Sequence, residues 1–381
     1  MTHRERVVAA LEHREPDRVP MDLGTARFSS MVKGAYDNLC ARLGFGRAGA
    51  MLDRMQQVVE MDEEVLKYLD VDVRAISFGP PDVIADEEYP DGRWKDEWGV
   101  VRIKPEGCQY YDQVHSPLAG EITVQTIARY PLPDPTDPGR YRGLRERTRR
   151  LREETDYAVM YNSRFHLVHQ TQYLRGFQDW YYDLGQNHDL FTALMEAVLE
   201  NLIELNRRAL DVIGDLIDVV AFGDDVGLQD RPVCSPALYR QLIWPYQKRA
   251  LETVHARTGA KILYHSCGST WRLINDFIAM GVDAINPVQV TAKDMEPQRL
   301  KREFGDRVSF WGGIDNHRLL PQGTPDQVRA EARRMFDIMG KGGGYVLGAV
   351  HNIQPDVPPE NVLALFEAGR RCAYAPAPAT A

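Results

Sequence analysis

Two short segments carry the residues with the clearest chemistry in this chain. Residues 261–268 form an apolar run that ends in His265 and Cys267, and residues 344–352 form another that is followed by His351. Residues two apart on an extended segment point to the same side, so His265 and Cys267 face one way. Three such ligands leave a fourth position of a zinc ion open, as in catalytic sites. The spacing predicts a metal site; the alternative is an ordinary interior histidine beside a small buried cysteine.

Strand-like apolar runs alternate with amphipathic helical patterns, and these elements must position the two segments. The strand-like runs lie at residues 19–24, 71–77, 157–161, 217–222, 261–264, 284–286, 308–311 and 345–347. Helical patterns lie between them, for example at residues 188–213, 236–258, 270–280 and 325–339. This alternation predicts an α/β fold, a (β/α)8 (TIM) barrel, with a doubly wound open sheet as the alternative. In such a barrel the ends of the strands present the functional side chains.

The remaining segments suggest one domain with an insertion. Residues 2–13 predict a helix, with Thr2 as its cap and Glu5 at the capping-box spacing. Residues 80–125 are rich in turns around residues 93–103, which predicts a β-hairpin insertion. We expect residues 1–372 to form a single barrel domain and the Pro/Ala-rich residues 373–381 to form a flexible C-terminal tail.

Other polar side chains follow predicted strands and are candidates for the same pocket. Asp224 and Asp225 close the run at 217–222, and one of the two is expected to act as ligand, base or substrate clamp, unless it caps a helix. Residues with a predicted substrate-binding role are Asn162, Arg164, His166, Tyr264 and Asp315. An arginine such as Arg164 more commonly pairs with a surface carboxylate.

Composition excludes several classes of function. The net charge of −9 and the mixing of both signs along the chain do not indicate a nucleic-acid partner. Five scattered cysteines argue against a disulfide framework, and no apolar run is long enough to span a membrane. The charged start lacks a signal-peptide pattern, so we expect a cytoplasmic protein. Gly-x-Ser-x-Gly and strand-following Gly-x-Gly-x-x-Gly patterns are absent, which disfavours hydrolase and dinucleotide-binding functions.

Several separated segments together resemble the uroporphyrinogen decarboxylase-like superfamily. They are residues 4–11 (RERVVAAL), 16–20 (PDRVP), 223–227 (GDDVG), 235–239 (SPALY), 244–246 (WPY), 265–268 (HSCG), 312–315 (GGID) and 355–362 (PDVPPENV). The resemblance spans nearly the whole chain and implies a (β/α)8 barrel of the uroporphyrinogen decarboxylase/methionine synthase type. It also implies one of two chemistries, decarboxylation or methyl transfer.

The resemblance favours the methyltransferase branch. Decarboxylases of the family carry an Arg-Gln-Ala-Gly-Arg signature that binds substrate carboxylates, whereas residues 21–27 here read MDLGTAR, with Arg27 as the local cation. The zinc-dependent methyltransferases bind zinc through His-x-Cys and a later cysteine, and they exchange methyl groups with a corrinoid (cobalamin) protein. His265 and Cys267 match the first two ligands, and His351 falls at the third.

Histidine in place of the third cysteine changes the charge of the implied site. A His/Cys/Cys set leaves zinc neutral, whereas His/Cys/His leaves a charge of +1 and a stronger Lewis acid. We therefore expect a small methyl donor such as a methyl ether, and hence O-demethylation, with thiol methylation as the other direction. Asp225 or the substrate would take the fourth zinc position, and Asp224, Asn162, Arg164 and Asp315 would orient the substrate.

The corrinoid is expected on a separate partner protein, because no Asp-x-His-x-x-Gly cobalamin-binding signature occurs in the chain. A homodimer is compatible with the resemblance. Two alternatives stay open. One is a metal-independent decarboxylase for a molecule smaller than a porphyrinogen, and the other is a non-catalytic tetrapyrrole- or corrinoid-binding protein.

Overall fold

Seven of the eight predicted strand runs pair in one parallel sheet in the computed structural model, which describes residues 1–46, 49–83 and 86–375. The strands pair in the order β13–β12–β11–β10–β9–β8–β3. Their bounds are β3 (Val73–Ile76), β8 (Ala158–Asn162), β9 (Val219–Gly223), β10 (Lys261–His265), β11 (Ala284–Asn286), β12 (Ser309–Trp311) and β13 (Tyr345–Val346). Each strand lies within or overlaps the run predicted from the sequence.

The segment after Arg18 closes this sheet into a barrel. Met21 forms a parallel bridge with Leu347, and the amide of Asp22 donates to the Leu347 carbonyl at 2.9 Å. On the other side, the amide of Asp72 donates to the Met21 carbonyl at 2.9 Å. The first predicted run, residues 19–24, therefore lies between β13 and β3 and takes the place of the eighth strand of the barrel. The (β/α)8 prediction is confirmed, and the open sheet is excluded.

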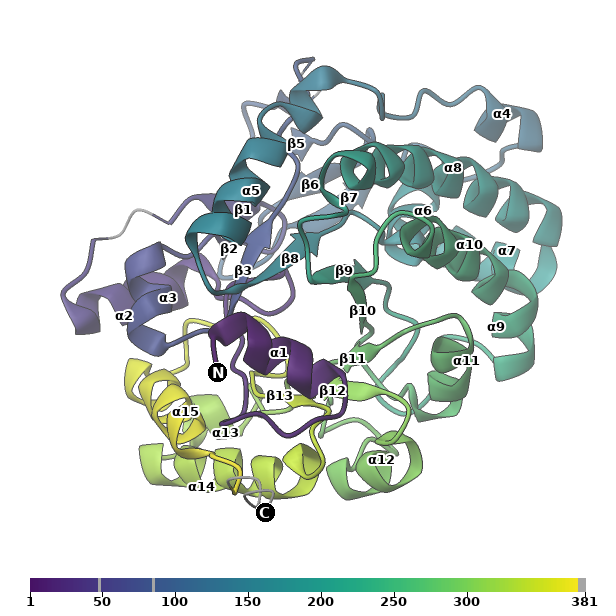
Figure 1. Ribbon diagram of the computed structural model, residues 1–381. Helices are drawn as coiled ribbons and strands as arrows, with labels where there is room; N and C mark the ends of the chain where they lie inside the picture. Colours follow the sequence, from purple (N-terminus) through teal and green to yellow (C-terminus); the bar gives the residue numbers. More distant parts are fainter. Residues whose placement is uncertain (47–48, 84–85, 376–381) are drawn as a thin grey trace.

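Helices surround the barrel on its outside, except α1, which lies across one end (Figure 1). They are α1 (His3–Leu11), α2 (Lys33–Leu43), α3 (Glu63–Leu69), α4 (Val124–Ala128), η1 (Pro138–Tyr141), α5 (Leu144–Glu154), α6 (Leu167–Arg175), α7 (Phe177–Gln186), α8 (His188–Ile213), α9 (Pro236–Leu242), α10 (Trp244–His255), η2 (Trp271–Leu273), α11 (Ile274–Ala279), α12 (Pro297–Phe304), α13 (Leu319–Gln322), α14 (Pro325–Met335), η3 (Phe336–Gly340) and α15 (Pro359–Arg371).

One predicted helix, at residues 236–258, is divided in two. The division between α9 and α10 falls at Ile243, just before Pro245. Proline lacks the backbone N–H and clashes with the carbonyl four residues earlier, so a single helix cannot run through this position. A helix capped by Thr2 with Glu5 forms as predicted.

The predicted hairpin insertion is larger than its sequence indicates. β5 (Trp94–Lys95) and β6 (Val101–Ile103) pair antiparallel as the expected hairpin, and β4 (Glu87–Glu88) and β7 (Asp112–His115) extend it to four strands. A separate pair, β1 (Met51–Asp53) and β2 (Val58–Val59), precedes it. At the other end of the chain, Ala373 bridges to Arg18, and residues 376–381 of the predicted tail lie outside the described residues.

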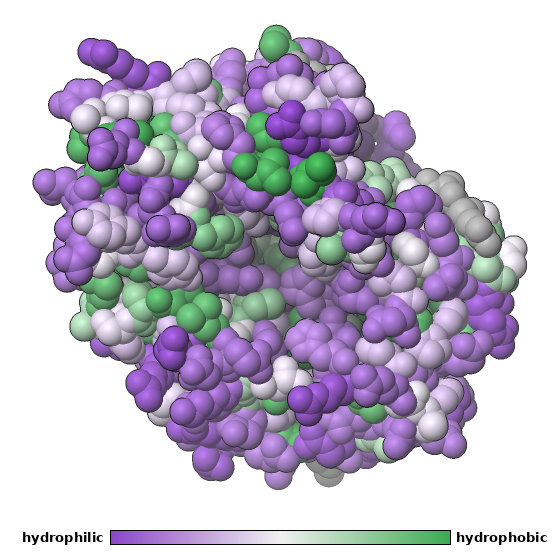
Figure 2. All heavy atoms as spheres, turned by 180° about the vertical axis from the view of Figure 1, so that it is seen from behind, coloured by the Kyte–Doolittle hydropathy of each residue, from purple (hydrophilic) through white to green (hydrophobic). Residues whose placement is uncertain are grey.

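The barrel interior is filled at one end and hollowed at the other. Alternate strand residues such as Leu263, Ala221 and Trp311 point inward, and Val7 and Leu11 of α1 pack against them. Helix α1 lies across this end in Figure 1, and Figure 2 shows the opposite face with a central hollow. Because side chains alternate along a strand, the residue two positions after an inward-facing one also faces inward. Residues two positions after these inward-facing ones, such as His265 and Gly223, therefore line the hollow.

A buried ion network fastens the closing segment to the barrel. The Asp72 carboxylate accepts from the guanidinium groups of Arg6 at 2.6 Å and Arg18 at 2.7 Å, and from the Met21 amide at 2.7 Å. The Nδ1 atom of His3 lies 2.7 Å from the same carboxylate. Burial opposes ionisation of Asp72, but these partners outweigh it and hold its pKa below the ordinary value.

We expect Asp72→Ala to lower the free energy of unfolding by about 3–5 kcal/mol, because it leaves buried cations without their partner. Urea unfolding followed by circular dichroism measures the loss, with Asp37→Ala, which removes a surface pair with Lys33, as the control with an effect below about 1 kcal/mol. The pKa of Asp72 is lower in the folded state, so its stabilisation is complete above about pH 4 and is lost as the pH falls. Equal effects of the two substitutions would contradict the assignment.

Candidate metal centre at the hollow end of the barrel

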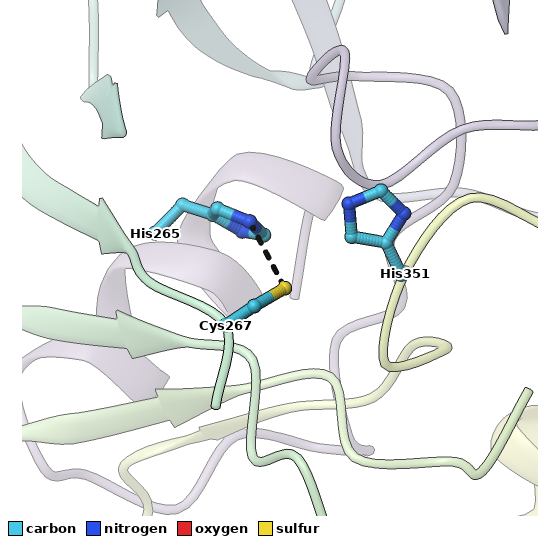
Figure 3. A group of neighbouring side chains, drawn as sticks. All are labelled: His265, Cys267 and His351. Atoms are coloured by element: carbon cyan, nitrogen blue, oxygen red, sulfur yellow. Dashed lines mark hydrogen bonds between the residues drawn. The ribbon is translucent and has the colours of Figure 1, made fainter. Parts of the chain in front are cut away.

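The three predicted zinc ligands meet at the hollow end of the barrel. His265 is the last residue of β10, Cys267 follows in the next loop, and His351 lies in the loop after β13. Their ligand atoms all lie within 4.8 Å of one another. Figure 3 shows His265 and Cys267 on one side, with the His351 ring opposite them. Residues far apart in the sequence are thus brought into one cluster.

The spacing of the cluster fits a zinc ion. The distance from Cys267 Sγ to His265 Nε2 is 3.5 Å. Ligand distances of about 2.3 Å for sulfur and about 2.0–2.1 Å for nitrogen place two donors of a tetrahedral zinc about 3.6 Å apart. The ligand atoms of the whole set lie within 4.8 Å of one another, so His351 would need to approach by about 1 Å to complete it. One thiol and two imidazoles are also ligand types that zinc favours.

Hydrogen bonding and stacking hold the His265 ring. Its Nδ1 atom lies 2.5 Å from Oδ1 of Asn286, and the Phe28 ring stacks on it with a centroid distance of 4.1 Å. The Nε2 atom faces the Cys267 thiol. Histidine ligands of metals commonly have their second ring nitrogen hydrogen-bonded in this way.

Asp225 lies beside the cluster. Its Oδ1 accepts the Cys267 amide at 2.7 Å and lies 3.5 Å from His265 Nε2. Its Oδ2 lies 3.7 Å from Nε2 of His169. Burial opposes ionisation of Asp225, but the neighbouring imidazoles and the Cys267 amide outweigh it and hold its pKa below the ordinary value. The carboxylate is therefore a fixed negative charge at the edge of the ligand cluster.

The histidines of the cluster are neutral at pH 7. Burial, with the neighbouring His265, lowers the pKa of His351 to about 4, and burial also lowers the pKa of His265. Neutral imidazoles keep the lone pair that a metal needs. Burial and the nearby Asp225 raise the pKa of the Cys267 thiol well above its usual value.

Asp224 points away from the cluster. Its Oδ1 accepts the amide of Val168 at 2.7 Å, within the first turn of α6, and its Oδ2 accepts from Gln247 at 3.1 Å. Burial raises its pKa to about 7. Of the two adjacent aspartates, Asp225 reaches the hollow, and Asp224 takes the helix-capping position that was the alternative prediction.

Tyr264 also lies outside the hollow. Its ring stacks on Phe222 and packs against Phe277, and its hydroxyl accepts from Gln247 at 3.0 Å. Neighbouring residues of a strand face opposite sides, so an inward His265 forces Tyr264 toward the outer helices. The predicted contact between Tyr264 and a substrate in the hollow is therefore corrected.

The other predicted substrate-binding residues lie in different places. Asn162 ends β8 two positions after the inward-facing Met160. Arg164 and His166 border a cavity of about 10 Å³, room for one water molecule, beside Glu97. The Arg164 guanidinium is half-exposed and lies 3.9 Å from Glu97. Asp315 accepts the amides of residues 317 and 318 in a turn.

Three residues of the centre were missed by the sequence analysis. Asn286 and Phe28 contact the His265 ring, and His169 contacts Asp225. His169 follows His166 by three residues, a helical spacing that places both near the start of α6. Asn286 ends a predicted strand in the same way as His265, which is a signal that the sequence contained.

Comparisons with known proteins agree with the fold. The family model of uroporphyrinogen decarboxylase (URO-D) matches residues 110–372. Uroporphyrinogen decarboxylase of Coxiella burnetii is 32% identical over 189 residues, 49% of this chain and 48% of that protein. The enzyme of Xanthomonas euvesicatoria pv. vesicatoria is 31% identical over 145 residues, 36% of this chain and 39% of that protein. The chain thus spans about half the length, or less, of these curated relatives in the matched region.

A solved structure covers nearly the whole fold. A methyltransferase from Methanosarcina mazei superposes with a TM-score of 0.67 at 17% sequence identity, covering 97% of this chain and 99% of that one. At this identity the likeness shows the barrel architecture. In the part of the chain that the structure describes, no helix is both long and apolar enough to cross a membrane.

Proposed function

The chain belongs to the uroporphyrinogen decarboxylase (URO-D) family, and from this premise we propose that it is a zinc-dependent methyltransferase. It would move a methyl group between a small methylated compound and a corrinoid carried by a partner protein. The observation that carries the proposal is the convergence of one thiol and two imidazoles within 4.8 Å at the hollow end of the barrel. The fold neighbour from Methanosarcina mazei, itself a methyltransferase, agrees with it.

His265, Cys267 and His351 would hold the zinc. When bound to this set, zinc carries a charge of +1 and supplies a Lewis acid. The two neutral imidazoles offer lone pairs at pH 7, and Cys267 gives up its proton on loading. The adjacent Asp225 adds a negative charge that either completes the ligand set or holds the substrate.

The charge of the set favours a methyl ether as the donor. Such a transfer would form a cobalt–carbon bond with an electron pair of the partner's reduced corrinoid and break the carbon–oxygen bond of the ether, whose electron pair would stay on the oxygen. The leaving oxygen becomes negative, and a cationic site stabilises developing negative charge. In the reverse direction, the same site would bind a thiol that receives the methyl group from the corrinoid.

A decarboxylase is the second candidate, and it is supported by the curated relatives, which are uroporphyrinogen decarboxylases. The segment 21–27 argues against a porphyrinogen substrate. There the carboxylate of Asp22 is buried and already accepts from Thr25 and from Trp311 Nε1, and Arg27 is the cation of the segment. A decarboxylase for a smaller acid would need neither a metal nor Cys267.

Metal analysis joined to a transfer assay separates the two candidates. Protein expressed with added zinc is expected to retain one zinc per chain. With a methyl aryl ether and reduced cobalamin, absorbance spectra are expected to show the methylated cobalamin. A zinc content well below one equivalent would refute the methyltransferase proposal. Decarboxylation of small acids by metal-free protein would establish the second candidate instead.

A further inference from the structure

The two strands that end at the centre do so in register. His265 of β10 is the pairing partner of Asn286 of β11, and both side chains are buried. Each follows an inward-facing residue by two positions, Leu263 and Ala284 respectively. The side chain of Asn286 therefore lies beside the His265 ring inside the barrel, where its Oδ1 is 2.5 Å from His265 Nδ1.

The orientation of the Asn286 amide is determined by a third strand. Its Nδ2 lies 3.2 Å from the backbone carbonyl of Trp311 in β12. A carbonyl only accepts, so the NH2 group must face Trp311 and the amide oxygen must face His265. An oxygen opposite Nδ1 requires that Nδ1 carry the hydrogen. The Nε2 atom then keeps the lone pair, and this is the atom that faces Cys267 Sγ at 3.5 Å.

A hydrogen bond to Asp22 holds the Trp311 side chain in place. Its indole Nε1 donates to the buried Oδ2 of Asp22 at 2.7 Å. The chain of contacts from Asp22 through Trp311 and Asn286 to His265 thus crosses the barrel interior. His351 is different, because the structure gives its ring no hydrogen bond with any of the described residues.

We propose that Asn286 is a positioning residue of the metal centre, which fixes the His265 ring with Nε2 ready for zinc. His265 and Cys267 then form the prepared half of the site, and His351 completes it. This inference rests on the proposed zinc-dependent function, but it assigns a role to a residue that touches neither zinc nor substrate.

The test compares zinc affinity among three variants of the full-length chain. Asn286→Ala is expected to weaken zinc binding about 10–100-fold, measured by competition with a chromophoric chelator. Asn286→Asp should recover part of this loss, because a carboxylate also accepts from Nδ1–H but cannot donate to the Trp311 carbonyl. Asn361→Ala is the matched control. That buried asparagine donates to the carbonyls of Leu320 and Gly323, so its loss should lower stability and leave zinc affinity unchanged.

Two spectroscopic readouts add to this test, and the first uses wild-type protein, so that the inference stays testable if an alanine variant fails to fold. Long-range ¹H–¹⁵N spectra of wild-type protein with labelled histidines, of which the chain has ten, should show His265 with hydrogen on Nδ1. The visible spectrum of cobalt-loaded Asn286→Ala should differ from that of wild type. Hydrogen on Nε2, or zinc affinity of Asn286→Ala within threefold of wild type, would overturn the inference and leave the proposed function standing. Failure of wild type to bind zinc would overturn both.

Discussion

Cys267→Ala is expected to release zinc and to lower methyl transfer by about 10³-fold or more, which corresponds to about 4 kcal/mol of lost transition-state stabilisation. Cys267 supplies the one anionic donor of the His265–Cys267–His351 set. Without it, two neutral imidazoles remain, and the cation that should stabilise the leaving oxygen is held weakly. Elemental analysis and the cobalamin methylation assay measure the two losses on the same preparation.

Cys234→Ala provides the control for this experiment. Cys234 is a free, half-buried cysteine in the loop before α9, and it is not among the clustered ligand residues. Its substitution should leave zinc content and turnover unchanged. If Cys267→Ala kept one equivalent of zinc and its activity, the thiol would have no role, and the decarboxylase candidate would become the better account of the chain.

The clustering of His265, Cys267 and His351 could be predicted because it depends on local patterns. The two-residue spacing of His265 and Cys267 sets their common side, and the apolar run before them marks the end of a strand. To predict that His351 lies beside them, the barrel had to be predicted as well, because the carboxyl ends of distant strands meet at one face of a barrel. The eight strand-like runs in the sequence were the basis for predicting the barrel.

Residue pairs at strand ends show where local patterns stop being informative. Tyr264 precedes the inward-facing His265, so alternation along β10 was enough to place it outside. Asp224 and Asp225 are different, because they follow the last residue of β9, where the backbone leaves the strand and alternation no longer applies. Which aspartate reaches the hollow depends on α6, whose first amides bind Asp224.

Contacts between separate strands could not be predicted from the sequence. Asn286 contacts His265 because β10 and β11 pair with Leu263 opposite Ala284. The sequence of one strand alone does not determine this register. Phe28 reaches His265 from a loop with no strand or helix pattern. The four-stranded insertion was underestimated because β4 is two residues long, too short to show a period.

His351→Cys is expected to keep zinc bound and to change the methyl compound that the site handles. The substitution adds a second thiolate, so the charge of zinc with its three named ligands falls from +1 to 0. A unit charge at about 4 Å is worth about 4 kcal/mol at an effective dielectric constant of about 20. We therefore expect kcat/KM for a methyl ether donor to fall by about 10²-fold or more relative to kcat/KM for a thiol acceptor.

The comparison of ether and thiol, measured on the same zinc-loaded variant, separates this effect from simple damage. A damaged site would lower both rates together, whereas a change of charge moves them in opposite directions, because a neutral site stabilises a leaving oxygen less and leaves a thiolate more nucleophilic. His188→Cys is the control, since His188 is an exposed histidine at the start of α8. It should leave the ratio of the two rates unchanged. An unaltered ratio in His351→Cys would show that the third ligand does not determine the methyl donor, and the substrate preference would then have to come from the walls of the hollow.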